Sequence, residues 1–253
     1  MRRRVTNKYL GVLNNHITTV LVDSMAGKTV IITEADIGKA KYLRRKEVLD
    51  TVTESNAFAA GIYCILSVAE NNSKVNTLMA RLEGAGLLMP EAALHGNEKL
   101  GELVSYIRFP NKKHNSIIGF SEWWNNSVMP QQLLDDVHDG RSKEFELRRL
   151  ISEQRIGLGY KGASFFMVKL GYENIVPVDI WMLRFLKDSG YGVIVPDYRT
   201  LGGLTGKRYL QYERLISDIA VDKGMTPSFF QFIIWAKYSN YKPQSGLYDY
   251  DTD

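Results

Sequence analysis

A lysine and an aspartate, each at a predicted helix start, are the residues whose types and spacing could do chemistry. Lys161 follows the segment Gly157-Leu158-Gly159-Tyr160, where the helix macrodipole disfavours a positive charge. Helix starts usually carry carboxylates, so a lysine at this position suggests a functional role. A neutral lysine amine is a nucleophile that can form a Schiff base. Asp179 begins another predicted helix 18 residues later, a separation that leaves room for one helix and a return loop. The two helix starts could therefore meet. A solvated surface lysine and a simple N-cap are the alternative interpretations.

The glycines before Lys161 predict a sharp turn between two helices. Residues 143–155 have the apolar spacing of an amphipathic helix, and a helix resumes over residues 162–170. Gly157 and Gly159 would let the backbone turn and lie close to another backbone. The second helix then begins with unpaired N–H groups, which form a ready site for an anion such as a phosphate. An ordinary helix–turn–helix connection is the alternative for this segment taken alone.

Most of the remaining sequence is typical of helices. The apolar spacing predicts helices over residues 36–45, 56–69, 73–84, 97–109, 129–139, 179–189, 207–223 and 227–238. Two short runs, residues 20–22 and 29–33, could pair as strands, whereas residues 110–121 and 196–206 resemble loops and residues 248–253 a frayed tail. We therefore expect a mainly α fold with a short N-terminal β element.

The composition narrows the class of protein but does not identify its function. The 253 residues carry 32 basic and 28 acidic side chains, a net charge of +4 that permits nucleic-acid binding but does not establish it. The single cysteine, Cys64, cannot form an internal disulfide or an iron–sulfur cluster, and the four histidines are too scattered to predict a metal site. Neither a secretory signal nor a membrane-spanning stretch is recognisable, so we expect a soluble intracellular protein.

The two segments that contain the lysine and the aspartate carry a family resemblance. Gly157 to Lys161, followed by Val176-Pro177-Val178-Asp179, resembles the signature of the helix-hairpin-helix DNA glycosylase superfamily, which includes endonuclease III and the 8-oxoguanine DNA glycosylases. Val-Pro-Val-Asp is similar to the eukaryotic-type 8-oxoguanine enzymes, and Gly-Tyr-Lys-x-Ala-Ser is closer to the archaeal ones. Arg184 matches a family arginine, while Trp181 stands where the family often has histidine.

The resemblance also implies roles for individual residues. It implies that Lys161 and Asp179 are the catalytic pair, and that Gly157, Leu158 and Gly159 form the hairpin that binds DNA phosphate. The polar turn at residues 70–74 resembles the family's DNA wedge, with Asn71 or Asn72 as the residue that fills the space of the extruded base and Lys74 beside it. Phe165 and Trp235 match positions that line the base pocket. A solvated turn and aromatic core packing are the alternatives for these last two assignments.

The function implied is base-excision DNA repair. The resemblance implies a bifunctional DNA glycosylase/AP lyase that removes an oxidised base, 8-oxoguanine by the wording of the motif, through a lysine Schiff base. The implied partner is double-stranded DNA with a damaged base, bound by a monomer in the cytoplasm or nucleoid of a prokaryote and away from membranes. No cofactor is implied, although a monovalent cation at the hairpin is compatible with the resemblance. The alternatives are a non-catalytic helix-hairpin-helix accessory protein and a glycosylase for oxidised pyrimidines.

The family fold also implies how the chain is divided. We expect two domains with the active-site cleft between them. Residues 53–172 would form a helical barrel that carries the helix-hairpin-helix, at about 143–171. Residues 1–52 and 173–253 would form a second, mostly helical domain from both ends of the chain.

Overall fold

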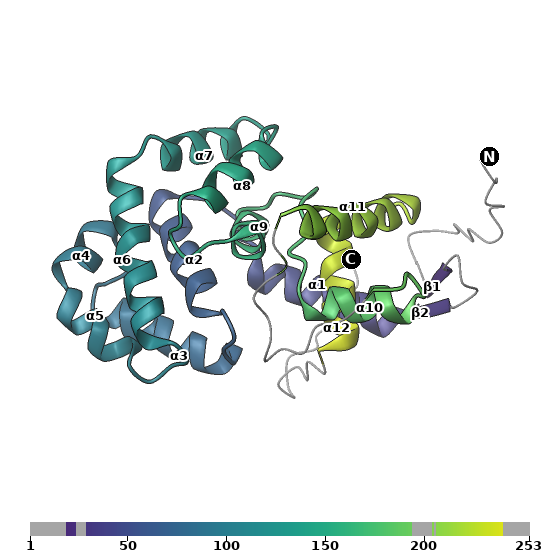
Figure 1. The fold of residues 1–253 in the computed structure, drawn as a ribbon, viewed down its shortest axis with the longest axis horizontal. Helices are drawn as coiled ribbons and strands as arrows, with labels where there is room; N and C mark the ends of the chain where they lie inside the picture. Colours follow the sequence, from purple (N-terminus) through teal and green to yellow (C-terminus); the bar gives the residue numbers. More distant parts are fainter. Residues whose placement is uncertain (1–18, 24–28, 194–203, 205, 240–253) are drawn as a thin grey trace.

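The computed structural model describes residues 19–23, 29–193, 204 and 206–239, and these are mostly helical (Figure 1). Two antiparallel strands, β1 (Thr19–Asp23) and β2 (Thr29–Thr33), pair over their whole length. The helices are α1 (Glu34–Glu47), α2 (Glu54–Leu66), α3 (Asn72–Gly84), α4 (Pro90–His95), α5 (Asn97–Val104), α6 (Pro110–Asn126), α7 (Met129–His138), α8 (Glu144–Glu153), α9 (Tyr160–Lys169), α10 (Ile180–Asp188), α11 (Lys207–Asp222) and α12 (Pro227–Tyr238). The expected mainly α fold with a short β element is confirmed.

Several helices begin where the sequence supplies a cap. Thr33 and Thr53 precede α1 and α2, and each hydroxyl accepts a hydrogen bond from the backbone N–H three residues later. In return, a side-chain oxygen of Asp36 accepts from the backbone N–H of Thr33, and the side-chain oxygen of Asn56 accepts from that of Thr53. These reciprocal capping boxes satisfy donors that a helix start otherwise leaves unpaired.

The loop expected at residues 110–121 is wrong, because these residues form most of α6. Pro110 lies at the first helical position, where the missing N–H costs nothing and the fixed φ favours a helix. Ile117, Phe120 and Trp124 follow at helical spacing and are buried. The Asn and Lys residues of the segment concealed this apolar stripe. Most of the other loop, at residues 196–206, and the whole tail at 248–253 lie outside the described residues.

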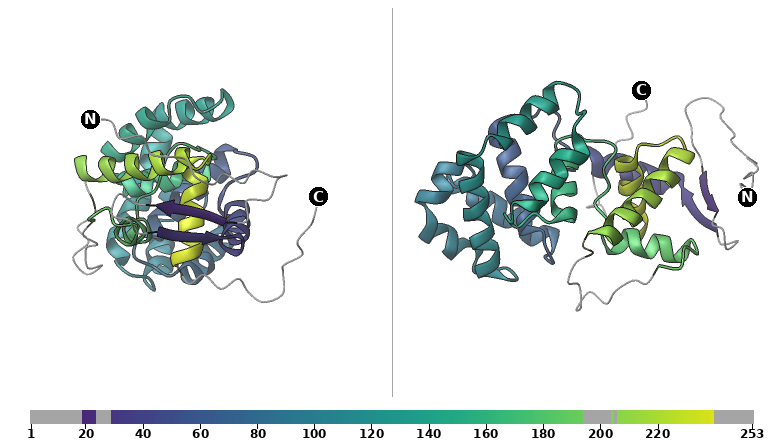
Figure 2. Two further views of the ribbon diagram at one scale, coloured as in Figure 1. Left: turned by 90° about the vertical axis from the view of Figure 1, so that its right-hand side faces the viewer. Right: turned by 45° about the horizontal axis from the view of Figure 1, so that its top comes forward.

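The buried apolar side chains form two clusters. The first cluster is formed by residues of helices α2 to α9, and the second by residues of β2, α1 and helices α10 to α12. Figure 1 and the right view of Figure 2 show these two groups of helices side by side. Helix α9 contributes to both, since Met167 belongs to the first cluster and Val168 to the second. We propose that the clusters are the cores of two domains with the boundaries expected above, at residues 53 and 172.

Ion pairs join the two clusters beside α9. Lys169 Nζ lies 2.6 Å from Glu47 Oε2, at the end of α1, and 4.1 Å from the centroid of the Tyr63 ring on α2. Arg44, also on α1, pairs with Glu173 at 2.6 Å. The first pair is largely buried, so water screens it little. These contacts hold α1 against the end of α9.

A glycine sets how closely α2 and α6 approach. A Cβ added at Gly61 would lie 2.2 Å from the ring of Phe120, which is fully buried among other aromatic rings and cannot easily move. We expect Gly61→Ala to lower the free energy of unfolding by about 1–3 kcal/mol, the usual cost of overpacking. Urea denaturation measures the change.

Gly119→Ala is the matched control on α6, where an added Cβ would meet nothing within 4 Å. That change should leave stability unaltered or raise it by up to about 1 kcal/mol. Equal stability of the two variants would contradict the close packing of α2 on α6.

Candidate active site

A tight hairpin joins α8 to α9. Gly157 has a φ of +81°, and a Cβ there would lie 2.5 Å from the Cβ of Ser116 on α6. Both the backbone conformation and the close approach therefore require glycine at this position. Leu158 is buried and anchors the turn in the first cluster. At Gly159 the φ is −71° and an added Cβ would meet nothing within 4 Å, so the sequence-based reason for glycine holds for Gly157 alone.

Helix α9 starts immediately after this hairpin, with Gly159 as its N-cap. Among the described residues, no side chain caps this helix start. Its first-turn N–H groups are therefore left for an external acceptor, and a helix N-terminus attracts anions. Lys161 is the second residue of α9 and its side chain is exposed. Lys161 thus lies at a helix start, as the sequence predicts, and no described side chain caps that start.

Asp179 is the N-cap of α10. Its Oδ1 accepts hydrogen bonds from the backbone N–H groups of Trp181, at 2.8 Å, and Met182, at 3.1 Å. The guanidinium of Arg184 lies 4.5 Å from the Trp181 ring centroid, so the residue that replaces the family histidine packs under a cation. The cap fixes the direction of the carboxylate, and its second oxygen is not used in capping.

The two helix starts lie within electrostatic reach of one another. Burial raises the pKa of Asp179 above its ordinary value, while the Lys161 ammonium and the N–H groups of Met182 and Trp181 act in the opposite direction. Lys161 also acts on Cys64 of α2, whose pKa burial raises to about 12. The Lys161 charge thus acts on the Asp179 carboxyl and, more weakly, on Cys64, and the buried cysteine stays a neutral thiol.

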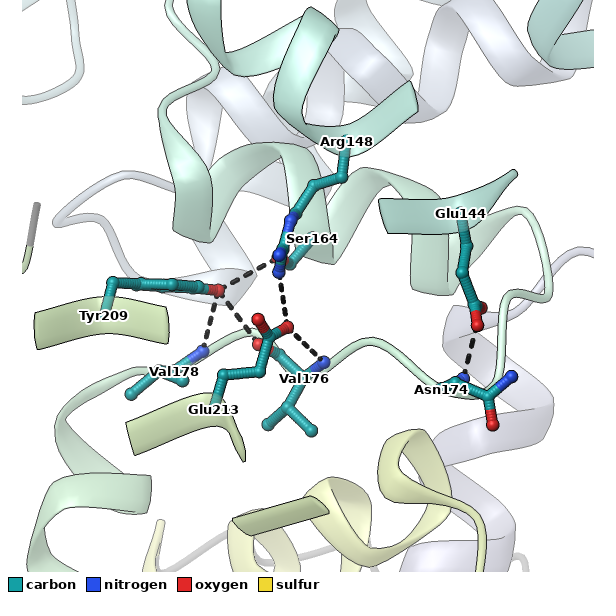
Figure 3. A network of polar contacts seen from close by, with 8 residues as sticks. All are labelled: Glu144, Arg148, Ser164, Asn174, Val176, Val178, Tyr209 and Glu213. Carbon is teal, nitrogen blue, oxygen red and sulfur yellow. Dashed lines mark hydrogen bonds and ion pairs between the residues drawn. The ribbon is translucent and has the colours of Figure 1, made fainter. Parts of the chain in front are cut away.

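The segment that leads into Asp179 is held by buried side chains of α11 (Figure 3). Glu213 accepts a hydrogen bond from the backbone N–H of Val176 at 3.1 Å and forms a buried ion pair with Arg148 of α8. The Tyr209 hydroxyl bonds to the backbone of Val176 and Val178. Sequence reasoning missed Tyr209 and Glu213. The signal was available, because both polar residues fall on the stripe that Ile216 and Ala220 place in the core.

The predicted wedge turn lies between α2 and α3, and its two asparagine side chains differ in their interactions. The Asn71 side chain caps α3 by accepting from Ser73 N at 2.8 Å, whereas Asn72 and Lys74 are exposed on the first turn. Lys113, buried beneath the turn, donates to the carbonyl of Leu66 at 2.7 Å. Burial lowers the pKa of Lys113 to about 8. The sequence predicts a loop at this lysine, whereas it lies in α6 and its ammonium group bonds to the end of α2.

A second loop lies against this turn and was also missed. The backbone N–H of Arg108 donates to Glu70 Oε2 at 2.7 Å, and its guanidinium donates to the carbonyl of Ala69 at 3.4 Å. The next residue, Phe109, is 58% exposed and has a φ of +57°, which is uncommon for a residue other than glycine. An exposed aromatic ring therefore stands beside the predicted wedge.

The two aromatic residues predicted for a base pocket lie in different clusters. Phe165 packs against the first cluster, with its ring centroid 6.2 Å from that of Tyr63 and 5.3 Å from Lys169 Nζ. Trp235 packs, partly buried, against the second cluster. Phe165 lies one turn after Lys161 on α9, so it is the nearer in sequence to the lysine. Their roles toward a base stay predictions.

One cavity is lined by residues other than Lys161 and Asp179. It has a volume of about 770 Å³ and is lined by α1, the turn between α7 and α8, and residues 171–174, which follow the end of α9 opposite to Lys161. Across the described ranges, no group of three His, Cys, Asp or Glu side chains could hold a metal ion. None of the described helices is long and apolar enough to cross a membrane.

Comparisons with known proteins agree with this geometry. Residues 39–225 match the family model described as 8-oxoguanine DNA glycosylase. Relatives named 8-oxoguanine DNA glycosylase/AP lyase include one from Picrophilus torridus, 26% identical over 55% of this chain and 60% of its own length, and one from Thermotoga maritima, 28% identical over 72% and 80%.

Solved structures show the same fold. The 8-oxoguanine DNA glycosylase of Methanocaldococcus jannaschii superimposes with a TM-score of 0.60 at 21% identity, covering 83% of this chain and 87% of that one. The structure of the same organism's 8-oxoguanine glycosylase/lyase in complex with DNA containing 8-oxoguanine gives a TM-score of 0.61 at 20% identity, over 83% and 90%. With the hairpin, the lysine and the capping aspartate in place, the chain belongs to the 8-oxoguanine DNA glycosylase family.

Proposed function

We propose that the protein is a bifunctional DNA glycosylase/AP lyase that removes 8-oxoguanine from duplex DNA in base-excision repair. The observation that carries the proposal is that Lys161 starts the helix after the glycine hairpin, Asp179 caps the start of α10, and the two lie within electrostatic reach of each other. The family match and the names of the relatives support the substrate. The protein acts as a monomer inside a prokaryotic cell, where its substrate is the chromosome.

The chemistry follows from the two side chains. The damaged nucleotide must leave the stack before it can be reached, at a cost of roughly a few kcal/mol. The Lys161 amine attacks the sugar carbon C1′ as the bond to the base breaks, and the base departs with that bond's electron pair. The Asp179 carboxylate stabilises the positive charge that develops on the sugar. The product is an aminal at C1′, which becomes an imine when the C1′–O4′ bond opens, the nitrogen giving up its proton and O4′ taking one. Loss of a proton from C2′ then expels the 3′ phosphate, which is the lyase step.

The surrounding surfaces hold the DNA. The uncapped N–H groups of α9 and the hairpin residues Gly157, Leu158 and Gly159 bind backbone phosphate without reading sequence. The exposed Asn72 and Lys74 enter the duplex at the wedge turn, since the Asn71 side chain is occupied by its cap. Phe165 and Trp235 contact the extruded base. No cofactor takes part, because the amine and carboxylate supply the nucleophile and its electrostatic partner; the monovalent cation at the hairpin stays a prediction.

Borohydride trapping tests the role of the lysine. We expect the wild-type protein to form a covalent adduct with a duplex containing 8-oxoguanine, and Lys161→Gln to form none, because reduction fixes an imine that only an amine can make. Lys99→Gln is the matched control, since it removes an exposed lysine of α5 to which no DNA contact is assigned and keeps the nucleophile.

The lesion in the duplex separates the alternatives. An adduct only with an oxidised-pyrimidine duplex would keep the mechanism and overturn the substrate. Salt-dependent binding without any adduct would make the protein a non-catalytic DNA-binding factor.

Asp179→Asn separates catalysis from stability. The variant keeps an oxygen that can cap α10 and loses the charge. Because burial raises the pKa of Asp179, its ionisation costs stability as pH rises from roughly 3.9, the ordinary value, through the folded-state pKa. We expect the free energy of unfolding of Asp179→Asn at neutral pH to equal or exceed that of the wild type, and the difference between the two to vanish toward about pH 4. Excision in single-turnover assays should fall by orders of magnitude, and near-normal turnover would remove Asp179 from the mechanism.

A further inference from the structure

The side chain of Tyr209 on α11 contacts the immediate neighbours of both proposed catalytic residues. Its ring lies against that of Tyr160, which precedes Lys161, with centroids 5.4 Å apart. Its hydroxyl oxygen lies 3.2 Å from the backbone nitrogen of Val178, which precedes Asp179. One buried side chain of a distant helix thus touches both elements that must be aligned for the reaction (Figure 3).

The same hydroxyl bridges the two elements by hydrogen bonds. Its oxygen lies 2.9 Å from Ser164 Oγ, one turn after Lys161 on α9, and 2.9 Å from the carbonyl oxygen of Val176. A phenol has one proton to donate. All partners are satisfied when Tyr209 donates to Val176, accepts from Ser164 and from Val178 N–H, and Arg148 donates to Ser164 at 3.3 Å. The bridge therefore has one consistent direction of donation.

The charged groups that face the hydroxyl keep it protonated and fixed. Burial raises the pKa of Tyr209, and the Glu213 carboxylate on the same helix raises it further, against the opposing charge of Arg148. The hydroxyl therefore remains a donor at physiological pH. The Arg148 guanidinium also lies 5.8 Å from the Tyr209 ring centroid and 5.4 Å from that of Tyr160, within range of a cation–π interaction with each ring.

We propose that Tyr209 is a positioning residue that sets the distance between Lys161 and Asp179, by bridging Ser164 and Tyr160 of α9 to the backbone of Val176 and Val178. This inference rests on the proposed function. The hydroxyl touches neither the DNA nor the reacting atoms. It acts by holding an amine and a carboxylate that must both face one sugar carbon, and a misplacement of about 1 Å at such a site can cost on the order of a hundredfold in rate.

The test is Tyr209→Phe, which keeps the buried ring and removes the bridge. We expect the single-turnover excision rate on 8-oxoguanine duplex to fall about ten- to hundredfold. The dissociation constant for the same duplex should stay within about twofold, because the DNA-facing residues are unchanged. Tyr172→Phe is the matched control: Tyr172 is also fully buried and gives its hydroxyl to a carboxylate, Asp136 Oδ2 at 2.8 Å, remote from the pair. That variant should excise at the wild-type rate.

A double-mutant cycle distinguishes positioning from general loss of structure. Ser164→Ala cuts the bridge on the α9 side only, so the variant combining it with Tyr209→Phe should be no slower than Tyr209→Phe alone. Ser164→Ala alone should also slow excision, so this single variant tests the proposal if Tyr209→Phe does not fold. Equal slowing by Tyr209→Phe and Tyr172→Phe, full additivity, or Ser164→Ala at the wild-type rate would each overturn the proposal. A wild-type protein that excises nothing would instead overturn the proposed function.

Discussion

The buried pair of Arg148 and Glu213 is the contact on which the placement of the site depends. Moving two charges out of water costs several kcal/mol, which is recovered only if each is paired and hydrogen-bonded. Glu213 also accepts the N–H of Val176, and one terminal nitrogen of Arg148 also donates to Ser164 on α9, while the buried Nε of Arg148 has no hydrogen-bond partner among the described residues. Removing either partner would leave the other charge buried, at a cost of about 3–5 kcal/mol. The pair therefore joins α8, α9 and α11 at one point, and the segment before Asp179 has little freedom to move.

That constraint explains how residues of two hydrophobic clusters can act as one site. Lys161 stands on α9, which contributes to both clusters, and Asp179 on α10, which belongs to the second. Helix ends supply the electrostatics: uncapped N–H groups beside the lysine favour phosphate, and a capped start orients the carboxylate. Backbone geometry thus prepares anion binding, while buried side chains of α11 set the spacing of the reacting groups.

The sequence was sufficient for the helices with strong apolar periodicity and for the helix starts at Lys161 and Asp179, because a hairpin glycine and an N-cap are local features. It failed at residues 110–121, where Asn and Lys concealed the stripe of Ile117 and Phe120. The apolar stripe of α11 marks Tyr209 as a buried residue, but the sequence could not assign its partners, since the contacts of that residue with Val178 and Ser164 join positions 31 and 45 residues apart. Such pairings depend on how α11 packs, which no local pattern encodes.

The measurement that tests the central claim most directly is peptide mapping of the borohydride-trapped complex by mass spectrometry. The protein is reacted with 8-oxoguanine duplex in the presence of borohydride, which reduces the imine, and the complex is digested with nuclease and protease. Mass spectrometry then identifies the peptide that carries the sugar remnant. The account predicts the remnant on the Nζ of Lys161. A remnant on Lys169, on Lys74 or on the terminal amine of Met1, or its absence from every peptide, would contradict it.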